Sequence, residues 1–94
     1  MYFITTIQIK NNQIQDTRCV GYVSDLDLAK EIIKNNDYDL NETIYNYALI
    51  ENIPEGIYQY DMSPLWFKFN ELNEKYESCE IPECCKNNVG FGIG

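Results

Sequence analysis

Four cysteines are the side chains of this sequence with the widest chemical capacity: Cys19, Cys79, Cys84 and Cys85. Four thiolates can hold a tetrahedral Zn²⁺ ion, but structural zinc sites usually use paired Cys-x2-Cys knuckles, which this sequence lacks. A nucleophilic cysteine needs a nearby cation or helix N-terminus to lower its pKa, and here Glu80 and Glu83 precede the adjacent pair. Ordinary reduced thiols are therefore expected, with Cys19 in the core. A zinc site, a redox thiol and a cysteine-dependent activity are the open alternatives.

The segment from Asp37 to Glu42 carries carboxylate and amide oxygens in the manner of the start of an EF-hand calcium loop. Its sixth position is Glu42, where that loop needs glycine, and its twelfth is Ala48, where the loop needs a bidentate glutamate. We therefore expect no metal at this segment. Asp37 and Asp39 are instead predicted to contribute to an acidic binding surface.

Histidine, the most frequent general base and metal ligand near neutral pH, does not occur in the sequence. Among 15 acidic residues chance pairs of carboxylates are unavoidable, and no pair is singled out by its spacing. The glycine-rich run from Val89 to Gly94 lacks the helix and the lysine of a phosphate-binding loop. The sequence thus predicts no catalytic residue and no cofactor, and a protein that binds rather than an enzyme.

The net charge of the 94 residues is −8, from 15 acidic and 7 basic residues. Such a protein is repelled by nucleic acids and anionic membranes and is attracted to basic surfaces. No apolar run reaches the length of a membrane span, and the first residues do not resemble a secretion signal. We expect a single domain over 1–94 that acts in the cytoplasm, without direct contact with nucleic acid or membrane.

Aromatic side chains gather in the second half of the sequence, at Tyr45, Tyr47, Tyr58, Tyr60, Trp66 and Tyr76. Tyrosine and tryptophan have an apolar body with a polar tip and are enriched in protein interfaces. Trp66 alternates with Lys68, opposite to Phe67, so it is predicted to be an exposed anchor. The predicted binding surface comprises Tyr58, Tyr60, Asp61 and Trp66, together with the acidic pair above. The alternative is that these aromatics pack against the C-terminal tail.

Hydrophobic periodicity indicates an α+β domain, a small antiparallel sheet of about five strands with one main helix on one face, in the order ββαβββ. The expected strands are 2–10, 18–23, 43–51, 65–70 and 75–81, with a short extended piece at 57–60. The helix is expected from an N-cap at Ser24 to about Asn35, and to bury Leu28, Ala29, Ile32 and Ile33. The tail, 82–94, is expected to add an edge strand or to stay loose.

The segment from Asn46 to Tyr60, with its Ile53-Pro-Glu-Gly turn, and the later Trp66-Phe-Lys order resemble small proteins of Firmicutes and their phages. The likeness extends over nearly the whole length, including the opening Tyr2-Phe-Ile-Thr-Thr strand. These motifs are turn formers and strand aromatics, so they imply no catalytic or binding residue. The resemblance implies an origin in a phage or mobile element, where small proteins often inhibit host defence, including CRISPR systems, in the host cytoplasm.

Two kinds of partner follow. The first is a host protein with a basic surface, which the acidic and aromatic side chains would bind as an inhibitor. The alternative is a small-molecule nucleotide, stacked on aromatic rings and met by Lys10, Arg18 or Lys68, with a possible homodimer formed through an exposed strand edge.

Overall fold

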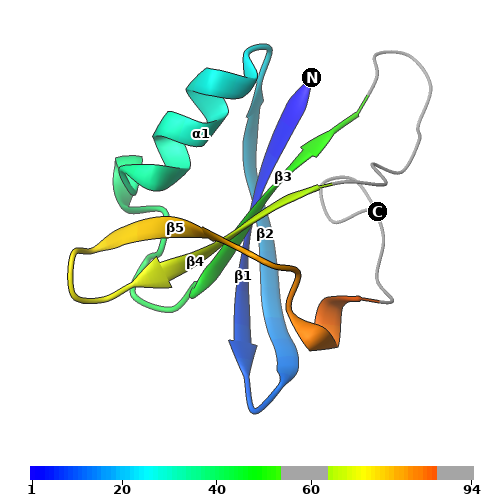
Figure 1. Cartoon of the computed structure of the whole chain (residues 1–94), viewed down its shortest axis with the longest axis vertical. Helices are drawn as coiled ribbons and strands as arrows, with labels where there is room; N and C mark the ends of the chain where they lie inside the picture. The colour runs from blue at the N-terminus through cyan, green and yellow to red at the C-terminus, as the bar shows by residue number, and fades with distance from the viewer. Residues whose placement is uncertain (54–63, 87–94) are drawn as a thin grey trace.

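The computed structural model describes residues 1–53 and 64–86, in which five antiparallel strands form one sheet in the order β2-β1-β3-β4-β5 (Figure 1). The strands are β1 (Tyr2–Lys10), β2 (Gln13–Val23), β3 (Tyr47–Asn52), β4 (Leu65–Asn70) and β5 (Lys75–Cys79). A single α-helix, α1 (Leu26–Lys34), lies on one face of the sheet, and two short 3-10 turns, η1 (Asp37–Asp39) and η2 (Glu83–Cys85), complete the described part. The predicted α+β class and element order are confirmed. The extended piece at 57–60 lies outside the described residues.

The hairpin of β1 and β2 is closed by Asn11 and Asn12, both of which have positive φ angles (55° and 58°). Two left-handed residues make the tight turn that matches the twist of paired strands. The register shifts twice along this hairpin, leaving Gln15 and Val20 as extra residues on β2. β2 begins at Gln13, five residues earlier than the expected strand 18–23. It forms one edge of the sheet, and most of its side chains are exposed. The prediction that Cys19 is a core residue is wrong for this reason.

Helix α1 is capped by Asp25, whose carboxylate accepts a hydrogen bond from the Asp27 backbone N–H at 2.9 Å. The expected cap, Ser24, lies one residue too early. Ala29 and Ile33, one turn apart, are fully buried against the sheet, whereas Leu28 is 45% exposed, contrary to expectation. The helix thus presents a narrower apolar stripe than the sequence pattern suggested. Among the described residues, no helix is long and apolar enough to cross a membrane.

The core between α1 and the sheet is made of eight buried residues: Ile4, Ala29, Ile33, Leu40, Ala48, Ile50, Phe67 and Tyr76. Tyr76 donates its hydroxyl hydrogen bond to the backbone carbonyl of Tyr45 at 2.7 Å, and its ring lies edge-on to Phe69 with centroids 5.1 Å apart. β3, expected to be central, is the middle strand of the sheet. On this face the core is therefore enclosed between α1 and the strands of the sheet.

The opposite face has a second core formed by Ile7, Leu49, Trp66 and Cys85. Trp66 lies opposite Leu49 on neighbouring strands and is only 5% exposed. The expectation that Trp66 is an exposed anchor is wrong, and the alternative, packing against the tail, is confirmed for this residue, because η2 and the residues before it pack over this face. Within the predicted tail, residues 82–86 form neither an edge strand nor a loose end, and residues 87–94 lie outside the described part.

Candidate functional site

Those predicted binding residues that the structure describes, Asp37, Asp39 and Trp66, do not lie on one surface. Trp66 is a core residue, and Tyr58, Tyr60 and Asp61 lie outside the described residues. Asp37 and Asp39 lie in η1, on the opposite side of the sheet from Trp66. Trp66 borders one surface hollow, and Asp39 borders a separate one on the helix side of the sheet.

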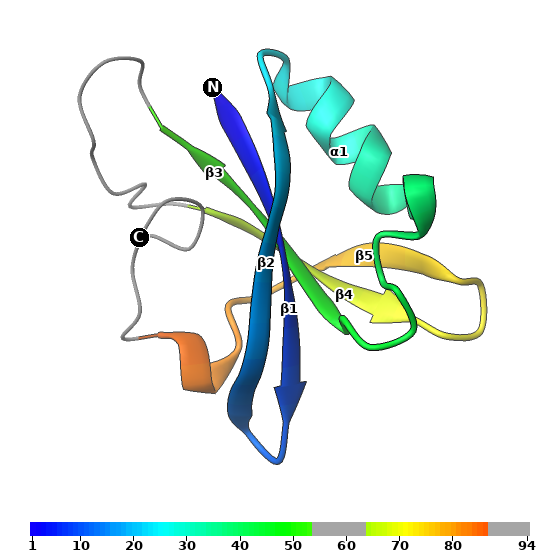
Figure 2. The ribbon, with the colours of Figure 1, turned by 180° about the vertical axis from the view of Figure 1, so that it is seen from behind.

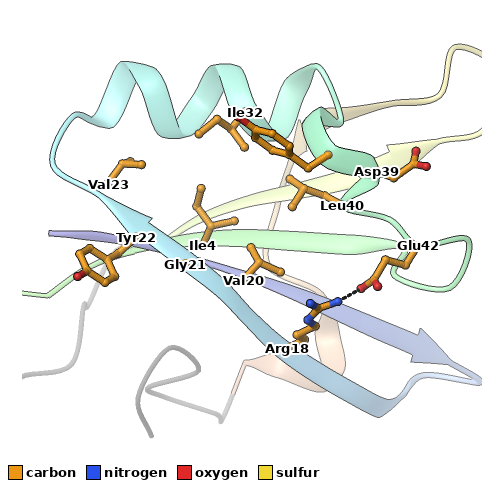
Figure 3. Close-up of a pocket in the computed structure, with 11 residues that line it drawn as sticks. Ile4, Arg18, Val20, Gly21, Tyr22, Val23, Ile32, Asp39, Leu40 and Glu42 are labelled. Atoms are coloured by element: carbon orange, nitrogen blue, oxygen red, sulfur yellow. Dashed lines mark hydrogen bonds and ion pairs between the residues drawn. The ribbon is translucent and has the colours of Figure 1, made fainter.

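That hollow is a groove of about 370 Å³ between β2, α1 and the segment 38–42, shown in Figure 3. Its inner wall is aliphatic and is formed by one residue each from β1, β2, α1 and the segment 38–42, namely Ile4, Val20, Ile32 and Leu40. Helix α1 runs along one side and β2 along the other, with Arg18 and Glu42 toward one end and Tyr22 and Val23 toward the other. Its volume falls in the range of about 300–1,000 Å³ typical of ligand pockets.

The segment 36–43, of which residues 38–42 form one wall of the groove, has an unusual backbone. Five residues in it that are not glycine have positive φ angles: Asn36, Tyr38, Asp39, Glu42 and Thr43. For bulky and β-branched residues this conformation is strained, and such strain concentrates at functional sites. The side-chain oxygen of Asn36 accepts from the backbone N–H of Asn41 at 3.1 Å, its amide donates to the Asn41 side chain, also at 3.1 Å, and Leu40 is buried beneath. These contacts hold the strained backbone in place.

Tyr38 is the clearest case of this strain, because its φ is 59° while its side chain is 91% exposed and gains little from packing. Replacing Tyr38 with glycine is expected to raise the free energy of unfolding by up to about 1 kcal/mol, since glycine adopts this conformation without steric cost. Urea denaturation followed by circular dichroism measures the change. The matched variant is Leu72→Gly, which removes another exposed side chain, 97% exposed, from a residue that is not among those with positive φ. Equal destabilisation by both would contradict the strain argument.

The charges at the groove are unequal. Arg18 forms an ion pair with Glu42 across the groove end, with side chains 55% and 43% exposed. The hydrogen bond and the negative charge of Glu42 raise the pKa of Arg18 above its usual value, so Arg18 stays cationic. Asp39 forms no ion pair within the described part of the chain, which leaves one uncompensated carboxylate beside an aliphatic wall. Such a site suits a cation attached to an apolar group.

The cations named for a nucleotide are not brought together. Arg18 pairs with Glu42 on the helix side of the sheet, whereas Lys68 lies on the opposite face, with its ammonium 5.9 Å from the centre of the Tyr47 ring. Lys10 lies at the far end of the β1–β2 hairpin. Three other cations border a hollow of about 650 Å³, namely Lys30, Lys34 and Lys86. Glu80 also borders this hollow, and Lys86 forms an ion pair with Glu83 at 2.8 Å. The nucleotide hypothesis stays a prediction.

Two of the four cysteines, Cys79 and Cys85, are placed so that the protonated thiol is favoured. Burial, followed by the hydrogen bond and charge of Cys84, raises the pKa of the Cys85 thiol to about 12, with the two Sγ atoms 3.9 Å apart. Burial likewise raises the pKa of Cys79. Raised thiol pKa values oppose both nucleophilic attack and metal binding, which need the thiolate. In residues 1–53 and 64–86, no cluster of three Cys, Asp or Glu side chains is placed to hold a metal ion.

Comparison of the chain with protein-family models, with curated proteins and with solved structures gives no match. The interpretation of the groove therefore depends on its own geometry. Sequence reasoning found Asp39 by residue type but missed the aliphatic wall, because Ile4, Val20 and Leu40 come from three separate segments. The signal that could have located it is the dense run of turn-forming residues from Asn35 to Asp39, directly after the helix.

Proposed function

We propose that this protein is a non-enzymatic binding protein, and that the groove between β2, α1 and the segment 38–42 docks on a partner protein with a basic surface. The observation that carries the proposal is the combination of an aliphatic wall with Asp39, a carboxylate that forms no ion pair among the described residues. A partner segment with an aliphatic side chain beside a lysine or arginine matches both features. The net charge of −8 would speed the encounter with such a partner.

Tyr38 and Tyr22 support this reading. Both line the groove, and both are large exposed side chains, at 91% and 59%. Exposed tyrosines beside a concave apolar surface are typical of the residues that dominate binding energy in protein interfaces. The strained backbone conformation of Tyr38 fits this proposal, because it places an aromatic ring at the surface, where a partner can cover it. A host-defence protein is the partner that the resemblance to phage proteins would favour.

The test compares two charge-matched variants. Tyr38→Ala with Asp39→Lys changes the groove, whereas Leu72→Ala with Glu71→Lys makes the same kind of change on the β4–β5 turn, away from it. Each protein is immobilised and exposed to bacterial lysate, and bound proteins are eluted with salt and identified. We expect a basic protein to be retained by the natural chain and by the turn variant, and its retention to fall at least roughly tenfold for the groove variant, as for loss of an interface hot spot.

The proposal also requires direct, saturable binding by the purified partner, measured by isothermal titration. Weakening with added salt is expected, because screening reduces the attraction between exposed charges. Equal retention by the groove and turn variants would overturn the assignment of the groove. Recovery of a small molecule with no protein would overturn the proposed function itself.

A further inference from the structure

Strand β2 is an exposed edge of the sheet. It is the first strand in the order β2-β1-β3-β4-β5, and seven of its eleven residues are exposed. In Figure 2 it crosses in front of the other strands. Its outer backbone groups meet no other strand within the described residues. An open edge of this kind is a template for pairing with another strand.

The charge of this edge differs from that of the whole chain. β2 contains one acidic residue, Asp16, and one basic residue, Arg18, so it is neutral in a protein of net charge −8. A second copy of the chain can therefore approach along β2 without placing like charges against each other there. Because the two residues are separated by one position, both side chains lie on the same face of the sheet.

The two register shifts restrict where such pairing can form. They leave Asp16 to Cys19 as the stretch of β2 with regular pairing, between the extra residues Gln15 and Val20. Bulges interrupt a ladder, so a regular new pairing is confined to this stretch. Two identical antiparallel strands are related by a twofold axis perpendicular to the sheet, which sets residues of the same face opposite each other. The twofold axis must pass beside a residue that has a neighbour within this stretch on each side. Only Thr17 and Arg18 meet this condition, so the new pairing is centred on one of them.

Charge separates these two registers. A pairing centred on Arg18 would set two arginines directly opposite each other. A pairing centred on Thr17 sets Asp16 of each copy opposite Arg18 of the other, twice, by symmetry. Like charges opposite each other on neighbouring strands oppose pairing, and opposite charges favour it. The sequence of β2 is thus complementary to itself in one register.

We propose that two copies of this chain pair through β2, antiparallel and centred on Thr17, with reciprocal contacts between Asp16 and Arg18. Both side chains can still bind. Arg18 contacts Glu42 through Nη1, so the other N–H groups of its guanidinium can donate to a second carboxylate. Asp16 accepts a hydrogen bond from the Tyr45 hydroxyl at 2.9 Å through one of its two carboxylate oxygens, which leaves the other oxygen for Arg18 of the second copy. The pairing would give one continuous sheet with both α1 helices on the same face. The two grooves would lie on that face, on either side of the axis.

The first test is charge exchange. Asp16→Arg and Arg18→Asp are each expected to weaken self-association roughly tenfold or more, because either change sets like charges opposite each other twice. An equimolar mixture of the two variants restores both opposite-charge contacts and is expected to form mixed dimers. Sedimentation equilibrium, carried up to the protein concentration of an NMR sample, measures association. Glu71→Arg and Lys75→Asp, placed on the other edge hairpin, are the controls and should leave it unchanged.

The second test fixes the register. In a Cys19→Ser background, Thr17→Cys would place two thiols opposite each other across the axis, at the Cβ separation of about 4.5–5.5 Å of paired strands, close enough for a disulfide after small adjustments. Rapid cross-linking under mild oxidation is expected, whereas Gln13→Cys, beyond the regular stretch, should cross-link poorly. A natural chain that stays monomeric, or a dimer unaffected by either charge reversal, would overturn the proposal. The proposal does not depend on partner binding, since association is measured with the protein alone.

Discussion

Replacing Trp66 with alanine is expected to lower the free energy of unfolding by about 3–5 kcal/mol, the usual cost of removing a large buried aromatic side chain. Trp66 is 5% exposed and packs with Ile7, Leu49 and Cys85 in the core opposite the helix. Domains of this size have about 5–15 kcal/mol of stability, so the variant should be partly unfolded near body temperature. The loss is measured by urea denaturation followed by circular dichroism. Tryptophan fluorescence cannot be used, because the substitution removes the only tryptophan of the sequence.

Two further variants separate a core role from a binding role. Trp66→Phe keeps most of the apolar volume and is expected to cost clearly less than the alanine change. Leu72→Ala, at a side chain that is 97% exposed, is expected to change stability by no more than about 0.5 kcal/mol. If Trp66→Ala unfolded at the same urea concentration as Leu72→Ala and lost only partner binding, Trp66 would be the exposed anchor that its residue type suggested.

The sequence was sufficient to predict features that depend on local pattern. Alternation over residues 2–10 and apolar spacing before Asn35 predicted β1 and α1, and Asn11-Asn12 predicted the hairpin turn, all of which the structure contains. These features are set by the period of side-chain placement and by backbone preferences of a few adjacent residues. Local rules therefore reach as far as the elements and their order.

Features that depend on which segments meet could not be read in the same way. Alternation correctly set Trp66 opposite to Phe67, but it could not show that η2 covers the Trp66 face. Cys19 sits in an apolar run, yet its strand is an edge, so the thiol is exposed. The groove joins Ile4, Val20 and Leu40 only through the register of β1 with β2 and the path of the segment after α1. Long-range register is set by the whole sheet, and single residues do not encode it.

The buried thiol of Cys85 makes the fold sensitive to alkaline pH in a way that one substitution can isolate. Its pKa is raised from 9.0 to about 12, chiefly by burial, so the folded chain keeps a proton that the unfolded chain releases. Stability from this group is fully present below about pH 9 and is lost as the pH rises toward 12. The loss approaches about 1.4 kcal/mol per pH unit. Tyr76, whose pKa is also raised by burial, adds a loss of the same sign.

Cys85→Ala is therefore expected to reduce the dependence of the unfolding free energy on pH between about pH 9 and pH 11, relative to Cys19→Ala, the control that removes an exposed thiol. Urea titrations at a series of pH values, followed by Trp66 fluorescence, give the two slopes. The alanine at 85 also leaves a small cavity, which lowers stability equally at every pH and does not alter the slope. General repulsion among carboxylates and deprotonated tyrosines is shared by both variants, so it cancels in their difference. Parallel curves for Cys85→Ala and Cys19→Ala would mean that the Cys85 thiol titrates alike in the folded and unfolded chains, and that η2 does not shield it from water.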